Sequence, residues 1–342
     1  MKALKIIAPG PFTTVQDRGR FGFQQFGVPP CGMLDKEAGD LANLLVGNDP
    51  DAAVLEFTFS GGQMEALDEF DISVTGGDMG LSINQNPCPV WTSHHVRPGD
   101  MIQLGLVNTG CRTYLALTGG IDVPVVMNSR SSYIGAKFGG FKGRILAPGD
   151  VLERGEGRQL AFSRTIPETL VPRYPSKITL RAVPGPQETY FDSGMETFFT
   201  QPFTVTPQSN RMGYRLDGAK VCRKKNMPQS IISEPSLPGG VQIPADGQPI
   251  ILLAEQTVGG YAKIATVISS DLPRLAQAVP GNQIRFEPVS LEQAHDIYRE
   301  KMNAFQKLQN ADLGVKSILT LGRDFYDHLV FRERMEKYMI QI

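Results

Sequence analysis

Residues 233–286 read SEPSLPGGVQIPADGQPIILLAEQTVGGYAKIATVISSDLPRLAQAVPGNQIRF, and this stretch decides the fold. Short apolar runs alternate with proline turns and with the glycine pairs Gly239-Gly240 and Gly259-Gly260, a pattern typical of short β-strands joined by tight turns. Side chains that can hydrogen-bond a small polar ligand stand between the two glycine pairs: Gln242, Gln248, Glu255, Gln256 and Thr257. The stretch therefore predicts a β-rich unit with a polar ligand site.

The same pattern continues through the rest of the chain. Its 36 Gly and 25 Pro are spread along the sequence rather than gathered in one linker. Several apolar runs show the period-two alternation of a sheet with one buried face. Strands are expected at residues 53–59, 70–76, 101–107, 112–119, 177–183, 202–207, 249–256 and 261–268. The sequence predicts a mainly β protein with short helices.

Helices are expected in five places. The clearest pattern covers residues 291–310, where apolar side chains repeat on one helical face. A second helix is expected from Asp35, its N-cap candidate, to Val46, before Gly47. Shorter helices are expected within 187–200 and 271–279, and another at 323–338.

Composition narrows the class of protein. The 342 residues carry 34 Lys plus Arg against 35 Asp plus Glu, a formal net charge of −1, which excludes a chain-wide basic field for nucleic acid or anionic lipid. The four cysteines are widely spaced and contain no C-x-x-C pair, which argues against a zinc site or a disulfide framework. No apolar run approaches the roughly 20 residues that a membrane span requires. We expect a cytoplasmic protein that is neither processed nor membrane-bound.

Three separated motifs carry a resemblance to a known family. They are TVQDRGRFGFQQFGVPPCGMLD at 14–35, SNRMGYRLDG at 209–218, and the stretch at 233–286. From about Leu4 to Phe286 the chain resembles the C-type subunit of bacterial 5-oxoprolinase. This family is also described as allophanate hydrolase subunit 2 or biotin-dependent carboxyltransferase, and it includes the Kip-type antagonist proteins.

The resemblance implies two cyclophilin-like β-barrel domains followed by C-terminal helices. We place the β-rich parts at residues 1–166 and 176–288 and the helical extension at 289–342, and strand exchange between the parts stays open. The segment after about Asp312 lies outside the resemblance, and its mixed charged and aromatic composition suggests a docking helix or an oligomer contact.

The family leaves three functions open. The preferred one is a subunit of an ATP-dependent 5-oxoprolinase complex, which converts 5-oxo-L-proline to L-glutamate with companion subunits of the A and B types. The alternatives are the carboxyltransferase component of a biotin-dependent urea or amide carboxylase, and a Kip-type antagonist that binds a kinase-inhibitor protein without catalysis. The sequence contains no GxxxxGK[ST] phosphate loop and no biotin-attachment lysine in a Met-Lys-Met motif. We therefore expect ATP to act at the level of the complex and biotin not to be attached to this chain.

Arginines dominate two of the family motifs. Arg18 and Arg20 can bind a carboxylate or phosphate of the substrate, with an ion pair to Asp17 as the alternative. In SNRMGYRLDG, a strand would place Arg211 and Arg215 on one side as a cationic stripe, and a solvated edge strand is the alternative. The resemblance favours Arg211 and Arg215 as catalytic groups that stabilise negative charge.

The remaining candidates surround the opening stretch. Glu234 is a candidate general base or ligand-binding carboxylate, and it precedes Pro235 where the family more often has glycine. Expected substrate-binding residues are Gln187, Gln242, Gln256, Gly259, Gly260, Tyr261 and Lys263. Cys31 stands where related sequences usually have serine, and without a nearby histidine it is expected to be buried rather than nucleophilic. The pair His94-His95 lies in a turn without partner ligands, so no metal site is expected.

Overall fold

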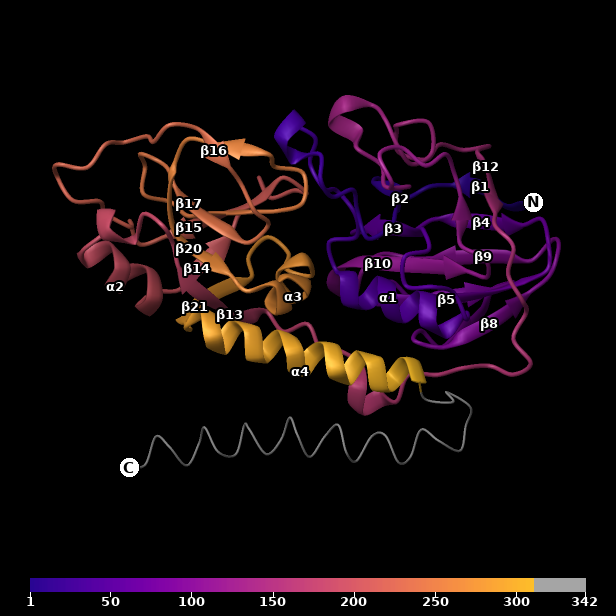
Figure 1. Ribbon diagram of the computed structural model, residues 1–342. Helices are drawn as coiled ribbons and strands as arrows, with labels where there is room; N and C mark the ends of the chain where they lie inside the picture. Colours follow the sequence, from indigo (N-terminus) through magenta and orange to yellow (C-terminus); the bar gives the residue numbers. More distant parts are fainter. Residues whose placement is uncertain (311–342) are drawn as a thin grey trace.

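The computed structural model describes residues 1–310. They form an N-terminal β-rich half, a barrel, and a long helix that runs along both (Figure 1). The expected helix at 323–338 lies outside the described residues. All eight expected strands are present, as is the fold class, mainly β with short helices. The exact domain limits stay a prediction.

Two sheets enclose the core of the N-terminal half. The larger sheet has the order β11 (Ile121–Asp122), β12 (Val151–Arg154), β1 (Lys2–Ala8), β4 (Gln63–Ala66), β9 (Met101–Leu104), β6 (Leu81–Ile83) and β7 (Asn86–Cys88). The smaller one has the order β2 (Thr13–Gln16), β3 (Val54–Thr58), β10 (Thr109–Leu117), β5 (Phe70–Asp78) and β8 (Ser93–Val96). Apolar side chains from both sheets, including Ile6, Phe57 and Leu115, form one buried cluster.

The second half is a closed barrel. Its strands have the order β13 (Lys177–Pro184), β20 (Ala262–Val267), β17 (Gly240–Ile243), β18 (Ile250–Leu252), β15 (Gly213–Gly218), β14 (Phe203–Val205) and β21 (Gln283–Pro288). β13 and β21 run parallel and close the barrel, while its other neighbouring strands are antiparallel. A separate two-stranded sheet joins β16 (Glu234–Pro235) to β19 (Val258–Gly259). Four of these seven strands, β17, β18, β20 and β21, begin within residues 233–286.

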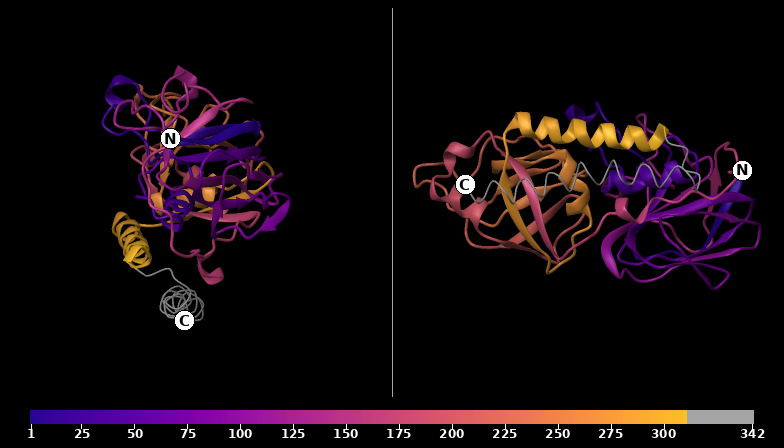
Figure 2. Two further views of the ribbon diagram at one scale, coloured as in Figure 1. Left: turned by 90° about the vertical axis from the view of Figure 1, so that its right-hand side faces the viewer. Right: turned by 90° about the horizontal axis from the view of Figure 1, so that it is seen from below.

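Four α-helices and five 3₁₀ turns occur among the described residues. They are α1 (Lys36–Leu45), α2 (Ser193–Thr200), α3 (Leu272–Ala276) and α4 (Leu291–Asn310), with 3₁₀ turns η1 (Gln24–Phe26), η2 (Ile134–Ala136), η3 (Glu168–Leu170), η4 (Glu188–Tyr190) and η5 (Ser269–Asp271). Asp35 caps α1 as expected, because its side chain accepts a hydrogen bond from the N–H of Ala38. Figures 1 and 2 show α4 running along both halves.

Contacts of α4 hold the two halves in one arrangement. The Lys301 ammonium lies 2.7 Å from Glu37 of α1 and donates to the carbonyl of Ser270 in η5, 3.0 Å away. Further along the helix, Leu308 is buried in a cluster with residues of α1. Within residues 1–310, no helix combines the length and apolar character that a membrane span would need.

Candidate functional site between the halves and on the barrel

A row of polar side chains crosses the smaller sheet on the face that receives α1 and the barrel. Thr14 of β2 stands opposite Glu56 of β3, Glu56 opposite Tyr114 of β10, and Tyr114 opposite Thr75 of β5. Residues directly opposite in antiparallel strands share one face. The Tyr114 hydroxyl donates to Glu56 over 2.8 Å, and Thr75 donates to the Ala38 carbonyl of α1 over 2.6 Å. The sheet thus presents a buried carboxylate, Glu56, toward the second half.

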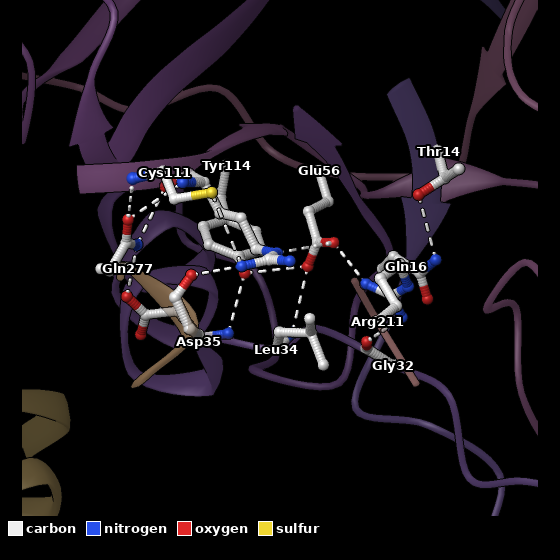
Figure 3. Close-up of polar contacts among 12 residues, drawn as sticks. Thr14, Gln16, Gly32, Leu34, Asp35, Glu56, Cys111, Tyr114, Arg211 and Gln277 are labelled. Atoms are coloured by element: carbon white, nitrogen blue, oxygen red, sulfur yellow. Dashed lines mark hydrogen bonds and ion pairs between the residues drawn. The ribbon is translucent and has the colours of Figure 1, made fainter. Parts of the chain in front are cut away.

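Arg211 reaches this carboxylate from the barrel side (Figure 3). Its guanidinium pairs with Glu56, donates to Glu255 over 2.5 Å, and donates to the carbonyl of Gly32 over 2.7 Å. Burial acts to lower the pKa of Arg211, but the two carboxylates outweigh it and raise that pKa, so Arg211 is charged at every physiological pH. The pairing joins residues 155 positions apart and connects the two halves.

A second set of hydrogen bonds extends the contact. Arg112 donates to the hydroxyl of Tyr214 over 2.7 Å, and its side chain lies 3.9 Å from Glu56. The Gln277 amide accepts from the backbone N–H groups of Cys111 and Arg112 and donates to Asp35 over 2.7 Å. We call these residues the interface network: Asp35, Glu56, Arg112, Tyr114, Arg211, Tyr214, Glu255 and Gln277.

The pKa of Asp35, a member of this network, is raised. The carboxyl group is fully buried, and burial raises its pKa to about 7, against the opposing effect of hydrogen bonds from Ala38 and Gln277. The neutral acid is therefore present near neutral pH.

Cys31 lies at the same contact, buried as expected. Its N–H donates to the carbonyl of Ala254 in the barrel over 2.9 Å, and burial raises the pKa of its thiol to about 12. A thiol with this pKa is protonated and is a poor nucleophile.

A different polar cluster lies on the barrel itself. Lys263 of β20 lies 2.9 Å from Glu234 of β16, whose carboxylate also accepts from Gln187 over 3.1 Å. The side-chain carbonyl oxygen of Gln187 in turn accepts from the backbone N–H of Lys263 over 3.0 Å. The lysine lowers the pKa of Glu234, which keeps this half-exposed acid ionised.

Gln242 completes this group. It pairs with Lys263 in the register of β17 and β20, and its side-chain nitrogen is buried without a hydrogen-bond acceptor in the described part of the chain. Gly259 of β19 packs directly on this amide, and a Cβ atom at Gly259 would overlap it. We call Gln187, Glu234, Gln242 and Lys263 the barrel cluster.

Other sequence-predicted residues lie nearby but outside this cluster. Gln256 donates to the carbonyl of Val258 over 2.6 Å, Gly260 accepts from the N–H of Ile231, and Tyr261 is exposed. They lie next to Val258 and Gly259 along the chain, and Gly259 is the residue that packs on Gln242.

The expected stripe of Arg211 and Arg215 is wrong. β15 begins at Gly213, so Arg211 precedes the strand and turns into the interface network, while Arg215 is exposed. Arg215 lines an open cavity of about 300 Å³ with Gln208, Asp217 and Gln248. The alternation rule applies only inside a strand, which explains the error.

The two arginines of the N-terminal motif also separate. Arg18 forms a bidentate pair with Asp40 at 3.0 and 2.8 Å, and it lies 3.3 Å from Asp51. Arg20 is fully buried. Neither pairs with Asp17, whose carboxylate instead accepts from Ser129, Ser131 and backbone N–H groups.

Sequence reasoning missed Glu56, Arg112, Tyr114 and Gln277. A usable signal was present for two of them, because Glu56 and Arg112 interrupt the apolar strands VLEFT and TGCRTYLAL. A charged residue inside a buried strand is rare unless it has a partner.

Comparison with known proteins agrees with this architecture. The family model of the carboxyltransferase domain, subdomains A and B, matches residues 26–288. The chain is 40% identical to the C-type subunit of 5-oxoprolinase from Escherichia coli (strain K12), over 89% of this chain and 97% of that protein. It is 34% identical to the C-type 5-oxoprolinase subunit from Haemophilus influenzae, over 84% of this chain and 91% of that protein.

Longer proteins contain the same unit. The crystal structure of the Kluyveromyces lactis urea amidolyase superimposes with a TM-score of 0.84 at 30% identity, over 90% of this chain. This chain spans only 20% of that protein. From the family match and the two 5-oxoprolinase subunits, the chain belongs to the carboxyltransferase domain family, subdomains A and B.

Proposed function

We propose that this protein is a subunit of an ATP-dependent 5-oxoprolinase complex that converts 5-oxo-L-proline to L-glutamate. The observation that carries the proposal is the 40% identity with the Escherichia coli 5-oxoprolinase subunit over 97% of that protein's length. Companion subunits of the A and B types would complete the enzyme. ATP would act at the level of the complex, because the sequence has no P-loop motif.

The barrel cluster supplies groups that suit a lactam. Opening this ring requires stabilisation of negative charge on the amide oxygen, because amide resonance makes the carbonyl unreactive. The Gln242 amide nitrogen lacks an acceptor among residues 1–310, and Gln242 and Lys263 are paired across neighbouring strands of the barrel wall. We assign Gln242 and Lys263 to the lactam oxygen and the ionised Glu234 to the ring nitrogen, whose N–H proton it accepts, with Gln187 holding Glu234 in place.

Arg211 has a different role in this proposal. Its three hydrogen-bond partners belong to the protein, and its side chain is 4% exposed, so it positions the halves rather than touching substrate. We do not retain Arg215 as a catalytic group, because it is exposed on the open cavity away from both clusters.

Carboxyl transfer is the second candidate function. The TM-score of 0.84 with the Kluyveromyces lactis urea amidolyase favours it, because an equivalent fold occurs in that enzyme. A urea-like substrate presents the same amide oxygen and N–H groups as a lactam, so the barrel cluster suits both.

The deciding experiment measures glutamate formed from 5-oxo-L-proline and ATP by this protein mixed with its companion subunits, leaving out each component in turn. Glutamate formation that requires this chain establishes the 5-oxoprolinase assignment. An assembled complex that consumes ATP without forming glutamate refutes it. In that case, carboxylation of urea with added carboxylated biotin carrier would support the second function, and tight partner binding without either activity would indicate an antagonist.

A further inference from the structure

Arg20 differs from the other buried arginines of the structure. Within residues 1–310, four arginines are at least nine-tenths buried: Arg20, Arg112, Arg154 and Arg211. Arg112 and Arg211 face Glu56, and Arg154 faces Asp68. Arg20 is 0% exposed, and in the same range no carboxylate lies within ion-pair distance of it. A buried charge without a counter-ion is costly, which makes this position unusual.

The guanidinium of Arg20 also has unused hydrogen-bonding capacity. One terminal nitrogen, Nη2, donates to the carbonyl of Ser131, and the ring centre of Phe138 lies 4.9 Å from the guanidinium carbon. The other two nitrogens, Nε and Nη1, have no hydrogen-bond acceptor within the described part of the chain. The Cys31 thiol is a weak acceptor beside the guanidinium, so Nε and Nη1 lack an oxygen acceptor among the described residues.

The backbone of Arg20 is bonded to the segment that contacts the barrel. The N–H of Arg20 donates to the carbonyl of Pro30 over 2.7 Å, and the next residue, Cys31, donates to Ala254 of the barrel. Burial raises the pKa of the Cys31 thiol, and the charges of Arg211 and Arg20 oppose this effect. Arg20 thus belongs to the contact between the halves, beside the interface network.

The loop beside Arg20 has no room for a side chain at Gly139. Gly139 has a φ of 68°, and a Cβ atom there would lie 2.7 Å from Nη2 of Arg20. The Arg20 side chain is fully buried, so an anion reaches the guanidinium only after a local rearrangement.

We propose that Arg20 is the receptor for the carboxylate of the substrate, a small lactam acid. The proposal rests on the proposed function, since it names the part of 5-oxo-L-proline that this residue recognises. Arginine suits a planar carboxylate because its N–H groups form a rigid fork, and a bound carboxylate would also supply the missing counter-ion.

The test compares two ligands that differ only in the carboxylate. Binding of 5-oxo-L-proline and of 2-pyrrolidinone, the same lactam without its carboxylate, is measured by calorimetry on the full chain within its assembled complex. We expect the wild type to prefer the acid by about 10- to 100-fold, the usual strength of a hydrogen bond to a charged group. Arg20→Met should bind both ligands equally, whereas the control Arg144→Gln, which removes a partly exposed partner of Asp150, should keep the preference.

Stability separates this role from a structural one. Arg20→Met removes an unpaired buried charge, so its melting temperature should be equal to or above that of the wild type, whereas loss of a structural arginine lowers it. If Arg20→Met does not fold, Arg20→Lys keeps the charge without the fork and should still reduce the preference. A folded variant that retains the full preference, or a wild type without one, overturns the proposal.

The failures of this inference and of the proposed function are distinguishable. An Arg20-dependent preference in a complex that makes no glutamate refutes the proposed reaction and keeps the carboxylate receptor. If the Arg20→Met complex forms glutamate as fast as the wild type, the proposed reaction stands and the carboxylate receptor is refuted.

Discussion

The interface network and the barrel cluster both pair a cation with a carboxylate, yet they differ in how completely the charges are satisfied. In the interface network, Arg211 is 4% exposed and bonds Glu56, Glu255 and a carbonyl, which uses every guanidinium nitrogen. In the barrel cluster, Glu234 is 37% exposed and the neighbouring Gln242 nitrogen has no acceptor among the described residues. The full pairing of Arg211 suits a contact that fixes two halves, whereas an exposed carboxylate and an unpaired amide donor suit a ligand site.

The largest expected effect belongs to the interface network. Arg211→Ala leaves Glu255 buried without its cation and leaves Glu56 with only the more distant Arg112, so we expect a loss of about 3–5 kcal/mol in the free energy of unfolding. Urea denaturation measures this loss. Arg215→Ala, four residues along and exposed, should stay within about 0.5 kcal/mol of the wild type. Equal stabilities of the two variants would show that the buried pairing of Arg211 does not stabilise the fold.

The pH dependence of stability tests Asp35. Its folded-state pKa of about 7 lies above the unfolded value of 3.8, so the native state favours the neutral acid. This group's contribution is fully present below pH 4 and is lost as pH rises to 7, by about 4 kcal/mol at most. Glu37 acts to raise this pKa and Lys301 to lower it.

Unfolding free energies of the wild type and Asp35→Asn, measured from pH 4 to 8, isolate this contribution. The advantage of the wild type over the variant should shrink with rising pH and become constant above pH 7. Parallel curves would show that Asp35 titrates normally.

Substitutions in the barrel cluster should change stability less than Arg211→Ala does, but they should clearly reduce catalysis. Lys263→Met removes the cation assigned to the lactam oxygen, so turnover by the assembled complex should fall about 100-fold, as for loss of one charge-stabilising donor. Lys220→Met, which removes an exposed lysine elsewhere on the barrel, provides the matched control. Unchanged turnover of the complex with Lys263→Met would show that the barrel cluster does not carry out the reaction.

The smallest expected effect is that of Arg18→Gln. Its pair with Asp40 is bidentate, but the arginine side chain is 37% exposed, and ion pairs in contact with water contribute less than about 1 kcal/mol. Thermal unfolding should detect a loss below that limit, and adding salt should reduce the difference further. A loss comparable to that of Arg211→Ala would show that exposure does not decide the strength of these pairs.

Local sequence patterns predicted most of the fold, because strand alternation, turn residues and helix caps act over a few neighbours. The Asp35 cap and the bounds of α4 agree with those patterns. The sequence also named all four members of the barrel cluster, since glutamine, glutamate and lysine stand beside glycine and proline turns. Its error with Arg211 and Arg215 came from extending strand alternation two residues beyond the start of β15.

By itself, the sequence determined the eight expected strands, the four expected helices within the described residues, the family motifs and the polar character of residues 233–286. Only the tertiary structure decided which charges are paired, because Arg211 and Glu56 meet through barrel closure and packing of the two halves, 155 residues apart. The same holds for Arg18 and Arg20, two positions apart, of which one pairs near the surface and the other is buried without a carboxylate from the described residues. Residue type states which interactions a side chain can make, whereas burial and partners depend on contacts between distant segments.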